Sequence, residues 1–364
     1  MLNKKLEDFI KVNDIENKFI SYFDPDTGFY MRTGILDEAG KDTGVDPFMT
    51  FFPQLLDVGI MGHCHHGLSG LCKSTGIKCY QSGGEINHPN MLLEDFKSIV
   101  DQSKGKVFQF ALGGRGDPEL HEDIEEILAY SRSNGIIPNM TTSGFMLTKE
   151  KAELIKKYCG AAAVSWYRND YTMRAIEMLL SLGVKTNIHF VLDETSIDEA
   201  IDLLKNRKVP KGVNRIIFLL FKPVGQGKEI KALSMEDPRT KEFFQLFDED
   251  YALKYGGFDS CSVPAMINFT KKLDPNCFDT CEGGRYSAYI TPDMKILPCS
   301  FDQENRWAVD LKKYTIAEAW KSIQFEEFRN HQRNACPDCK KRSLCLGGCP
   351  VKPEIVLCNE KHNV

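Results

Sequence analysis

Between residues 55 and 221, short apolar runs alternate with amphipathic segments, and this rhythm constrains the fold of the chain most strongly. The segments between the runs have apolar residues at helical spacing, and Gly135 and Gly183 are suited to end two of the helices. Strand–helix units joined by short turns predict parallel strands with right-handed crossovers. We expect buried strands at 55–60, 107–112, 136–142, 161–166, 184–192 and 215–221. Because six strands are too few for a closed eight-stranded barrel, we predict an α/β fold with a partial (β/α)6 TIM-like barrel.

The cysteines form a second pattern, because twelve of the thirteen fall into two groups, at 64–79 and 261–358. The thirteenth, Cys159, stands alone at the end of a predicted helix and reads as a small buried hydrophobe. The number is odd and the residues are clustered, which favours metal binding over a disulfide framework.

The first group lies in a glycine-rich loop directly after the strand at 55–60, and it holds Cys64, Cys72 and Cys79. A Gly-Gly turn at 113–114 follows the next strand. In parallel α/β folds, ligands sit outside the carboxyl ends of the strands. The pattern therefore predicts a metal cluster and a small ligand side by side at that end, where Ser143, Ser165 and Asn187 also converge.

The second group contains the run Cys336-x2-Cys339-x5-Cys345-x3-Cys349, in which closely spaced thiolates can surround one soft metal centre. A structural zinc site is the alternative interpretation, but a zinc ribbon needs two Cys-x2-Cys pairs and this run has one. The spacing therefore favours iron–sulfur clusters.

Composition excludes several other classes of protein. The chain has 364 residues, 42% of them hydrophobic and 27% charged, and a formal net charge of −5, so it offers no basic footprint for nucleic acid or an anionic membrane. No apolar run approaches the length of a membrane span, and the N-terminus lacks the core of a signal peptide. We expect a soluble, cytoplasmic protein.

These motifs carry a family resemblance over roughly residues 50–360. The barrel segment resembles the radical SAM superfamily, and the cysteine-rich segment resembles a SPASM domain with two auxiliary iron–sulfur clusters. Together they are similar to radical SAM/SPASM maturases of ribosomally made peptides. On this resemblance we divide the chain into an N-terminal extension at 1–50, a radical SAM partial barrel at 51–250 and a SPASM domain at 251–364.

The resemblance implies cofactors and their ligands in the barrel. Cys64, Cys72 and Cys79 would hold a [4Fe-4S] cluster whose fourth iron binds S-adenosylmethionine, although their spacing, Cys-x7-Cys-x6-Cys, departs from the usual Cys-x3-Cys-x2-Cys. The residues expected to contact S-adenosylmethionine are Gly113, Gly114, Arg115, Gly116 and Asp117 in the turn, with Tyr80, Ser143, Ser165 and Asn187. His63, His65 and His66 are expected to be exposed or supporting loop residues rather than ligands.

The SPASM resemblance implies two further [4Fe-4S] clusters with interleaved ligands, three clusters in all. Cys281, Cys299 and Cys349 would hold the inner one together with an upstream thiol, either Cys261 or Cys277; if neither binds, one iron is left open to a substrate thiol. Cys336, Cys339, Cys345 and Cys358 would hold the outer one. Asp302 lies near the position of a catalytic aspartate in sulfatase maturases, but it is offset.

The implied function is reductive cleavage of S-adenosylmethionine to a 5′-deoxyadenosyl radical, which abstracts hydrogen from a peptide to form a thioether or carbon–carbon cross-link. The implied partners are a precursor peptide and a low-potential electron donor such as flavodoxin or ferredoxin, without nucleic acid or membrane. Two alternatives stay open. One is an anaerobic maturase that forms formylglycine in sulfatases, and the other is a non-catalytic, zinc-binding scaffold.

Overall fold

A computed structural model describes residues 5–274 and 279–358. Its main feature is a sheet of ten strands in the order β10-β9-β8-β7-β6-β5-β4-β11-β12-β13. Seven barrel strands are parallel: β4 (Leu55–Val58), β5 (Gln109–Leu112), β6 (Ile137–Thr142), β7 (Ala162–Ser165), β8 (Thr186–Leu192), β9 (Arg215–Leu220) and β10 (Gly256–Phe258). The predicted partial barrel is confirmed, and all six predicted strands are present.

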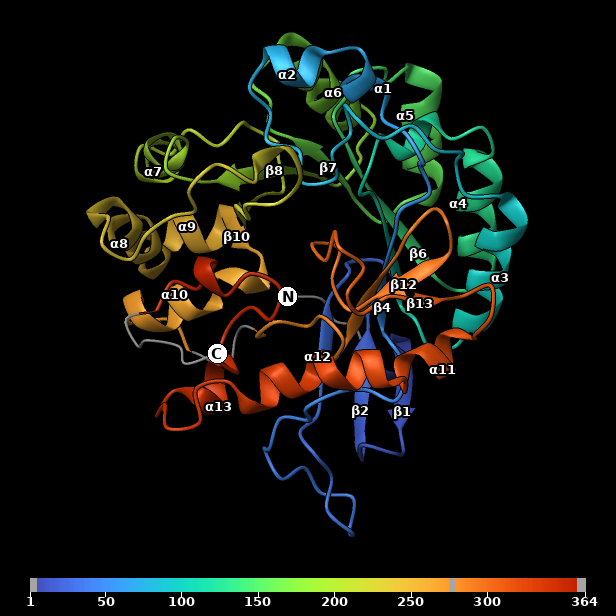
Figure 1. Ribbon diagram of the computed structural model, residues 1–364, viewed down its shortest axis with the longest axis vertical. Helices are drawn as coiled ribbons and strands as arrows, with labels where there is room; N and C mark the ends of the chain where they lie inside the picture. Colours follow the sequence, from blue (N-terminus) through green and yellow to red (C-terminus); the bar gives the residue numbers. More distant parts are fainter. Residues whose placement is uncertain (1–4, 275–278, 359–364) are drawn as a thin grey trace.

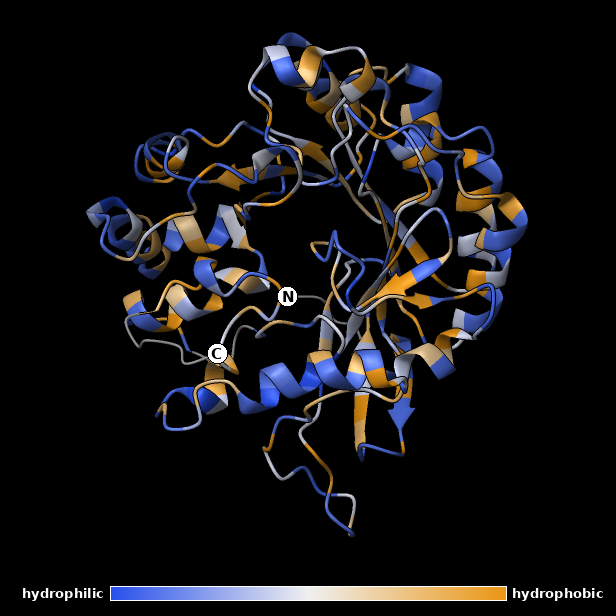
Figure 2. Ribbon diagram, viewed as in Figure 1, coloured by the Kyte–Doolittle hydropathy of each residue, from blue (hydrophilic) through white to orange (hydrophobic). Residues whose placement is uncertain are grey.

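Helices cover the outside of this curved sheet (Figure 1): α3 (Leu93–Ser103), α4 (Ile124–Ser133), α5 (Lys149–Tyr158), α6 (Asp170–Ser181), α7 (Ile197–Lys205), α8 (Pro238–Gln245) and α9 (Asp250–Tyr255). Gly135 and Gly183 follow α4 and α6 with φ of +78° and +71°, as expected for glycines that end helices. Hydrophobic residues lie on the strands and on the helix faces toward them (Figure 2). Phe96 of α3, for example, packs edge-to-face on Phe110 of β5, with 5.8 Å between ring centroids.

The cysteine-rich segment joins the same sheet instead of standing apart from it. Its strands are β11 (Ser287–Ile290), β12 (Lys295–Leu297) and β13 (Val309–Asp310), and its helices are α10 (Val263–Phe269), α11 (Ile316–Trp320), α12 (Ile323–Asn334) and α13 (Arg342–Cys345). Strand β11 pairs parallel with β4, with Tyr289 opposite Asp57, and β12 and β13 continue antiparallel. At the other edge, β10 extends the barrel sheet beyond residue 250. Hydrogen bonding between strands therefore crosses the boundary expected at 250.

The N-terminal segment forms a separate antiparallel sheet of β1 (Ile10–Asp14), β2 (Phe19–Phe23) and β3 (Tyr30–Arg32). Phe23 stacks on Phe108 just before β5, at 5.2 Å between ring centroids. The Arg32 guanidinium donates to Asp46 of the same segment and to Asp279 of the cysteine-rich segment. Together with the Phe23 contact, this bond attaches the sheet to both other parts of the chain. In the described ranges, no helix has the length and apolar character needed to cross a membrane.

Candidate radical SAM and auxiliary-cluster sites

The three-cysteine loop leaves the carboxyl end of β4 and contains two short helices, α1 (His65–Leu68) and α2 (Leu71–Ser74). Cys64 is the N-cap of α1, and its sulfur accepts the Gly67 N–H at 3.3 Å. Backbone packs closely within the loop: a Cβ on Gly62 would lie 1.9 Å from the Pro89 carbonyl oxygen, and one on Gly67 would lie 2.3 Å from that of Gly83. Glycine at these positions lets separate turns of the long loop approach each other.

The structure brings Cys64, Cys72 and Cys79 together despite their wide spacing. A Cβ placed on Gly83 would lie 3.5 Å from both the Cys64 and the Cys79 sulfur. Burial, and then the neighbouring thiols, raise the pKa of Cys72 to about 12. Burial likewise raises the pKa of Cys64 to about 11. The site thus provides three thiols, of which that of Cys72 is buried and the other two are partly buried, and all three would lose protons on binding a metal cluster.

The histidines of the loop differ in their surroundings. His66 is 2% exposed; its Nδ1 lies 3.0 Å from the Cys72 sulfur, and its ring stacks on Tyr167 at 5.5 Å between centroids. Burial lowers the pKa of His66, which favours the neutral ring. His63 and His65 contact each other, with 3.3 Å between their Nε2 atoms. Among the three histidines of this described loop, His66 is therefore the one whose side chain contacts a cysteine.

The Gly-Gly turn after β5 contacts this loop. Gly114 and Gly116 have φ of +89° and +73°, and a Cβ on Gly116 would lie 2.4 Å from the His63 carbonyl oxygen. The Arg115 guanidinium donates to the Gln81 and Gly62 carbonyl oxygens, each at 3.3 Å. The cysteine loop and the Gly-Gly turn therefore lie side by side, as the spacing predicts.

Two buried carboxyl groups lie under the turn. Asp117 accepts hydrogen bonds from the Ser143 N–H and from its hydroxyl, the latter at 2.6 Å, and Glu119 accepts one from Thr142. Burial raises the pKa of Asp117, and burial followed by the charge of Asp117 raises that of Glu119 to about 8. Ser143, expected to contact S-adenosylmethionine, thus binds the turn itself.

The remaining predicted contacts face the interior of the barrel. Tyr80 packs on Phe301, with 4.5 Å between ring centroids, and Ser165 lies opposite His189 in the β7–β8 register. Asn187 is the second residue of β8 and so lies at the amino end of the strand, not at the carboxyl end where the pattern predicted it; its side-chain oxygen accepts a hydrogen bond from Asn214 at 2.8 Å. Asn187 and His189 line a cavity of about 360 Å³ inside the barrel, which Thr27 and Gly28 of the N-terminal segment also border.

Asp57 is an interior residue that the sequence interpretation missed. Its neighbours along β4, Leu56 and Val58, are fully buried on the opposite face, so alternation places Asp57 on the inner face of the barrel. Burial raises the pKa of Asp57 to about 6. Its charge in turn raises the pKa values of Tyr80 and Tyr289, after burial, so all three groups lie near one another. A charged residue inside an otherwise apolar strand is the signal that identifies this position.

Four thiols from the segment that begins just before α10 lie near one another: Cys261, Cys281, Cys299 and Cys349. Cys261, Cys281 and Cys349 line one cavity, which Cys345 also borders, and the charges of Cys349 and Cys281 act on Cys299. Burial raises the pKa of Cys281 to about 11, with Cys349 as the next cause. The structure therefore places Cys261 with the inner set. Cys277, the other candidate, lies outside the described residues.

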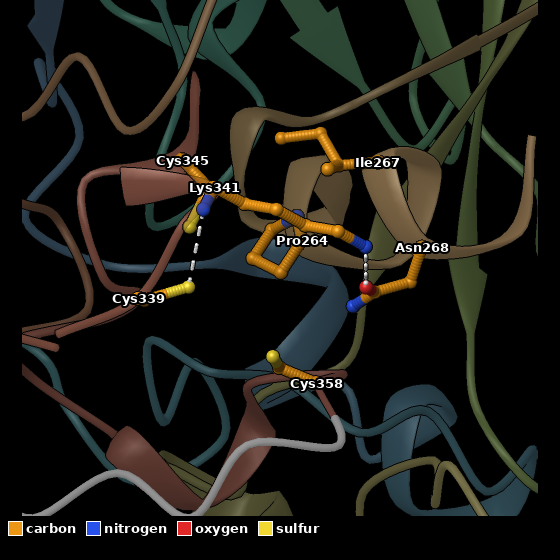
Figure 3. Close-up of a pocket in the computed structure, with 7 residues that line it drawn as sticks. All are labelled: Pro264, Ile267, Asn268, Cys339, Lys341, Cys345 and Cys358. Atoms are coloured by element: carbon orange, nitrogen blue, oxygen red, sulfur yellow. Dashed lines mark hydrogen bonds between the residues drawn. The ribbon is translucent and has the colours of Figure 1, made fainter. Parts of the chain in front are cut away.

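A second set of thiols lies between α10 and α13. Cys339, Cys345 and Cys358 face a common cavity of about 190 Å³, which Lys341 also lines (Figure 3). The Cys336 sulfur lies 3.8 Å from the Gly347 carbonyl oxygen, at the turn after α13. These are the four cysteines expected to hold the outer cluster.

Asp302, the candidate catalytic aspartate, has a structural role in a turn. Its carboxylate accepts hydrogen bonds from the backbone N–H groups of Arg306 at 3.1 Å and Trp307 at 3.0 Å. Within residues 5–274 and 279–358, no three His, Cys, Asp or Glu side chains form a group that could hold a single metal ion. A cubane cluster spreads its thiolates over separate iron corners.

Comparison with known proteins places these sites in a family context. The model of the SPASM domain, described as an iron–sulfur cluster-binding domain, matches residues 281–341. SuiB of Streptococcus suis, crystallised with S-adenosylmethionine, superposes with a TM-score of 0.63 at 19% identity over 86% of this chain and 78% of SuiB. The chain has the fold of a radical SAM enzyme with a C-terminal SPASM domain.

The sequence relatives of this chain differ in their named activities. Fe-coproporphyrin III synthase of Methanosarcina barkeri is 24% identical over 46% of this chain and 46% of its own length, so the match spans less than half of that relative. PqqA peptide cyclase of Methylocella silvestris is 21% identical over 70% of this chain and 72% of its own length. SuiB has also been crystallised with its precursor peptide SuiA, and that structure superposes with a TM-score of 0.64 at 18% identity over 86% of this chain and 77% of SuiB.

Proposed function

We propose that this chain is a peptide maturase that uses S-adenosylmethionine to form a thioether or carbon–carbon cross-link in a ribosomally made precursor peptide. The observation that carries the proposal is the convergence of Cys64, Cys72 and Cys79 beside the Gly113-Gly114 turn, at the open end of a barrel joined to a SPASM domain. The peptide substrate rests on the similarity to PqqA peptide cyclase and to SuiB.

The thiols fit three [4Fe-4S] clusters. Cys64, Cys72 and Cys79 would hold the first and leave one iron corner for S-adenosylmethionine. Cys261, Cys281, Cys299 and Cys349 would hold the inner auxiliary cluster, and Cys336, Cys339, Cys345 and Cys358 the outer one. Each set is composed of soft thiolate donors, which select iron–sulfur clusters. When bound, the first cluster and S-adenosylmethionine supply a carbon-centred radical that abstracts hydrogen.

The chain itself positions the reactants. The hydrogen bonds from the Arg115 guanidinium to the Gln81 and Gly62 carbonyl oxygens keep the Gly-Gly turn against the cysteine loop. Asp57, with a pKa raised to about 6, is poised near neutral pH to accept a proton from a substrate group inside the barrel. A low-potential flavodoxin or ferredoxin would supply the electron.

A cytoplasmic anaerobic maturase that forms formylglycine remains the alternative within the same chemistry, and Asp57 would serve it equally as a base. The zinc-scaffold alternative needs neither the Gly-Gly turn nor the thiols of the first loop. The porphyrin-related activity in the name of the Methanosarcina relative gives a third substrate class to include in any assay.

The deciding experiment begins with protein purified without oxygen. We expect about twelve iron atoms per chain, four for each cluster, and formation of 5′-deoxyadenosine and methionine when dithionite and S-adenosylmethionine are added. A precursor peptide supplied to this mixture should lose the mass of two hydrogen atoms. Zinc without iron would exclude the radical mechanism, whereas 5′-deoxyadenosine with no change in any peptide would exclude only the peptide substrate.

Asp57→Asn should separate cleavage of S-adenosylmethionine from product formation. The amide cannot accept the proton, so we expect product formation to fall by about 10²- to 10⁴-fold while 5′-deoxyadenosine is still made. In the parent protein, the rate should rise with pH as Asp57 ionises near pH 6, and this step should disappear in the variant. Asp202→Asn, at an exposed ion pair with Lys208, is the control. An unchanged pH profile would exclude Asp57 as the base.

A further inference from the structure

A buried ion pair joins the barrel to the inner auxiliary site. Lys222 follows β9 and is 4% exposed, and its Nζ lies 2.6 Å from the Asp259 carboxylate. Nζ also donates to the Leu220 carbonyl oxygen at 2.8 Å. Burying a lysine is costly unless its charge is paired, so this position is specifically supported.

The ion pair lies at the base of two cysteine-bearing turns. Asp259 follows β10 and precedes Cys261 by two residues, and it accepts a hydrogen bond from the Ser262 hydroxyl at 3.0 Å. On the other side, Nζ of Lys222 lies 4.3 Å from the ring centroid of Phe301, which follows Cys299 by two residues. One ammonium group therefore contacts the neighbours of two inner thiols.

Lys222 keeps its charge in this position. Burial favours the neutral amine, but the opposing interactions, the charge of Asp259 first among them, outweigh burial and raise the pKa of Lys222 above its ordinary value. Since Asp259 and the Leu220 carbonyl oxygen hold its ammonium group, Lys222 is a fixed cation beside the turns of Cys261 and Cys299.

We propose that Lys222 is a positioning residue that holds the turns of Cys261 and Cys299 and raises the reduction potential of the inner auxiliary cluster. Nearby charge is one of the main determinants of cluster potential, because a cation stabilises the more negative, reduced state. Asp259 fixes the ammonium group in place and partly offsets its effect. The inference depends on the proposed function only in assigning a four-iron cluster to Cys261, Cys281, Cys299 and Cys349.

The test is a redox titration of the full, anaerobically purified chain, followed by electron paramagnetic resonance and without substrate. The signal that disappears in Cys349→Ala identifies the inner cluster. We expect Lys222→Met to lower the midpoint potential of this signal, and Lys222→Arg to leave it near the parent value. Lys185→Met is the matched control, because the Nζ of Lys185 donates to the Thr27 carbonyl oxygen on the N-terminal segment. This variant should leave the midpoint potential unchanged.

An unshifted midpoint in iron-replete Lys222→Met would overturn the inference. If that variant fails to load the cluster, Lys222→Gln decides, because it keeps a polar side chain beside Asp259 and removes only the positive charge. A lowered midpoint supports the proposal, and an unchanged or raised one contradicts it. If no signal disappears in Cys349→Ala, the assignment of the inner cluster itself fails, which is a separate result.

Discussion

Replacing Cys72 with alanine is expected to reduce the iron content from about twelve to about eight atoms per chain and to abolish cleavage of S-adenosylmethionine. The first site offers three thiols, so the loss of one leaves two, which are too few to hold a cube while one iron binds a substrate. Iron and sulfide analysis, with chromatography of 5′-deoxyadenosine, measures both effects.

Cys159→Ala provides the matched control for this prediction. Cys159 is the C-cap of α5, and burial raises its pKa to about 12, as burial does for Cys72, but it packs against the hydrophobic core of the barrel. We expect full iron content and activity in this variant. If Cys72→Ala keeps its iron, the thiol set of the first loop is not the cluster site.

Gly116→Ala should weaken binding of S-adenosylmethionine at least about tenfold, which corresponds to about 1.4 kcal/mol. The backbone at Gly116 has φ of +73°, and a methyl group there would lie 2.4 Å from the His63 carbonyl oxygen and 3.0 Å from Met61. The turn and the cysteine loop must therefore move apart, and the ligand binds where they meet. Equilibrium binding to the iron-loaded protein measures the change.

Gly105→Ala separates crowding from backbone strain. Gly105 has φ of +72°, but a methyl group there would meet no atom within 4 Å. Both variants should lose about 1 kcal/mol of stability or more, because alanine disfavours the left-handed conformation. Only Gly116→Ala should also lose affinity. Equal affinities would show that the ligand does not depend on the contact between turn and loop.

The barrel strands could be predicted because their apolar runs are long enough to be read locally. β10 could not, since it has three residues and two of them are glycines, which carry no strand pattern. The pairing of β11 with β4 could not be predicted from the sequence either, because contacts between residues more than 200 positions apart leave no local periodicity.

For the cysteines too, local spacing could be interpreted from the sequence, whereas tertiary contacts could not. Spacing alone indicated metal clusters and grouped Cys339 with Cys345, but it left Cys261 and Cys277 equivalent. Cys261 approaches Cys281 because β10 and η5 (Ser260–Ser262) place it at the barrel edge, which is a tertiary effect. Asp57 was overlooked because its apolar neighbours Leu56 and Val58 dominated the reading of the strand.

The pairing of β11 with β4 has a consequence for any attempt to study the two halves separately. Truncation near residue 250 would remove β10, which pairs with β9, and β11, which pairs with β4. Unpaired backbone N–H and C=O groups would then lie along both edges of the barrel sheet. Such open edges recruit other chains, so the isolated barrel should be recovered as aggregates. The two halves would then behave as one cooperative folding unit, in which damage to either abolishes both.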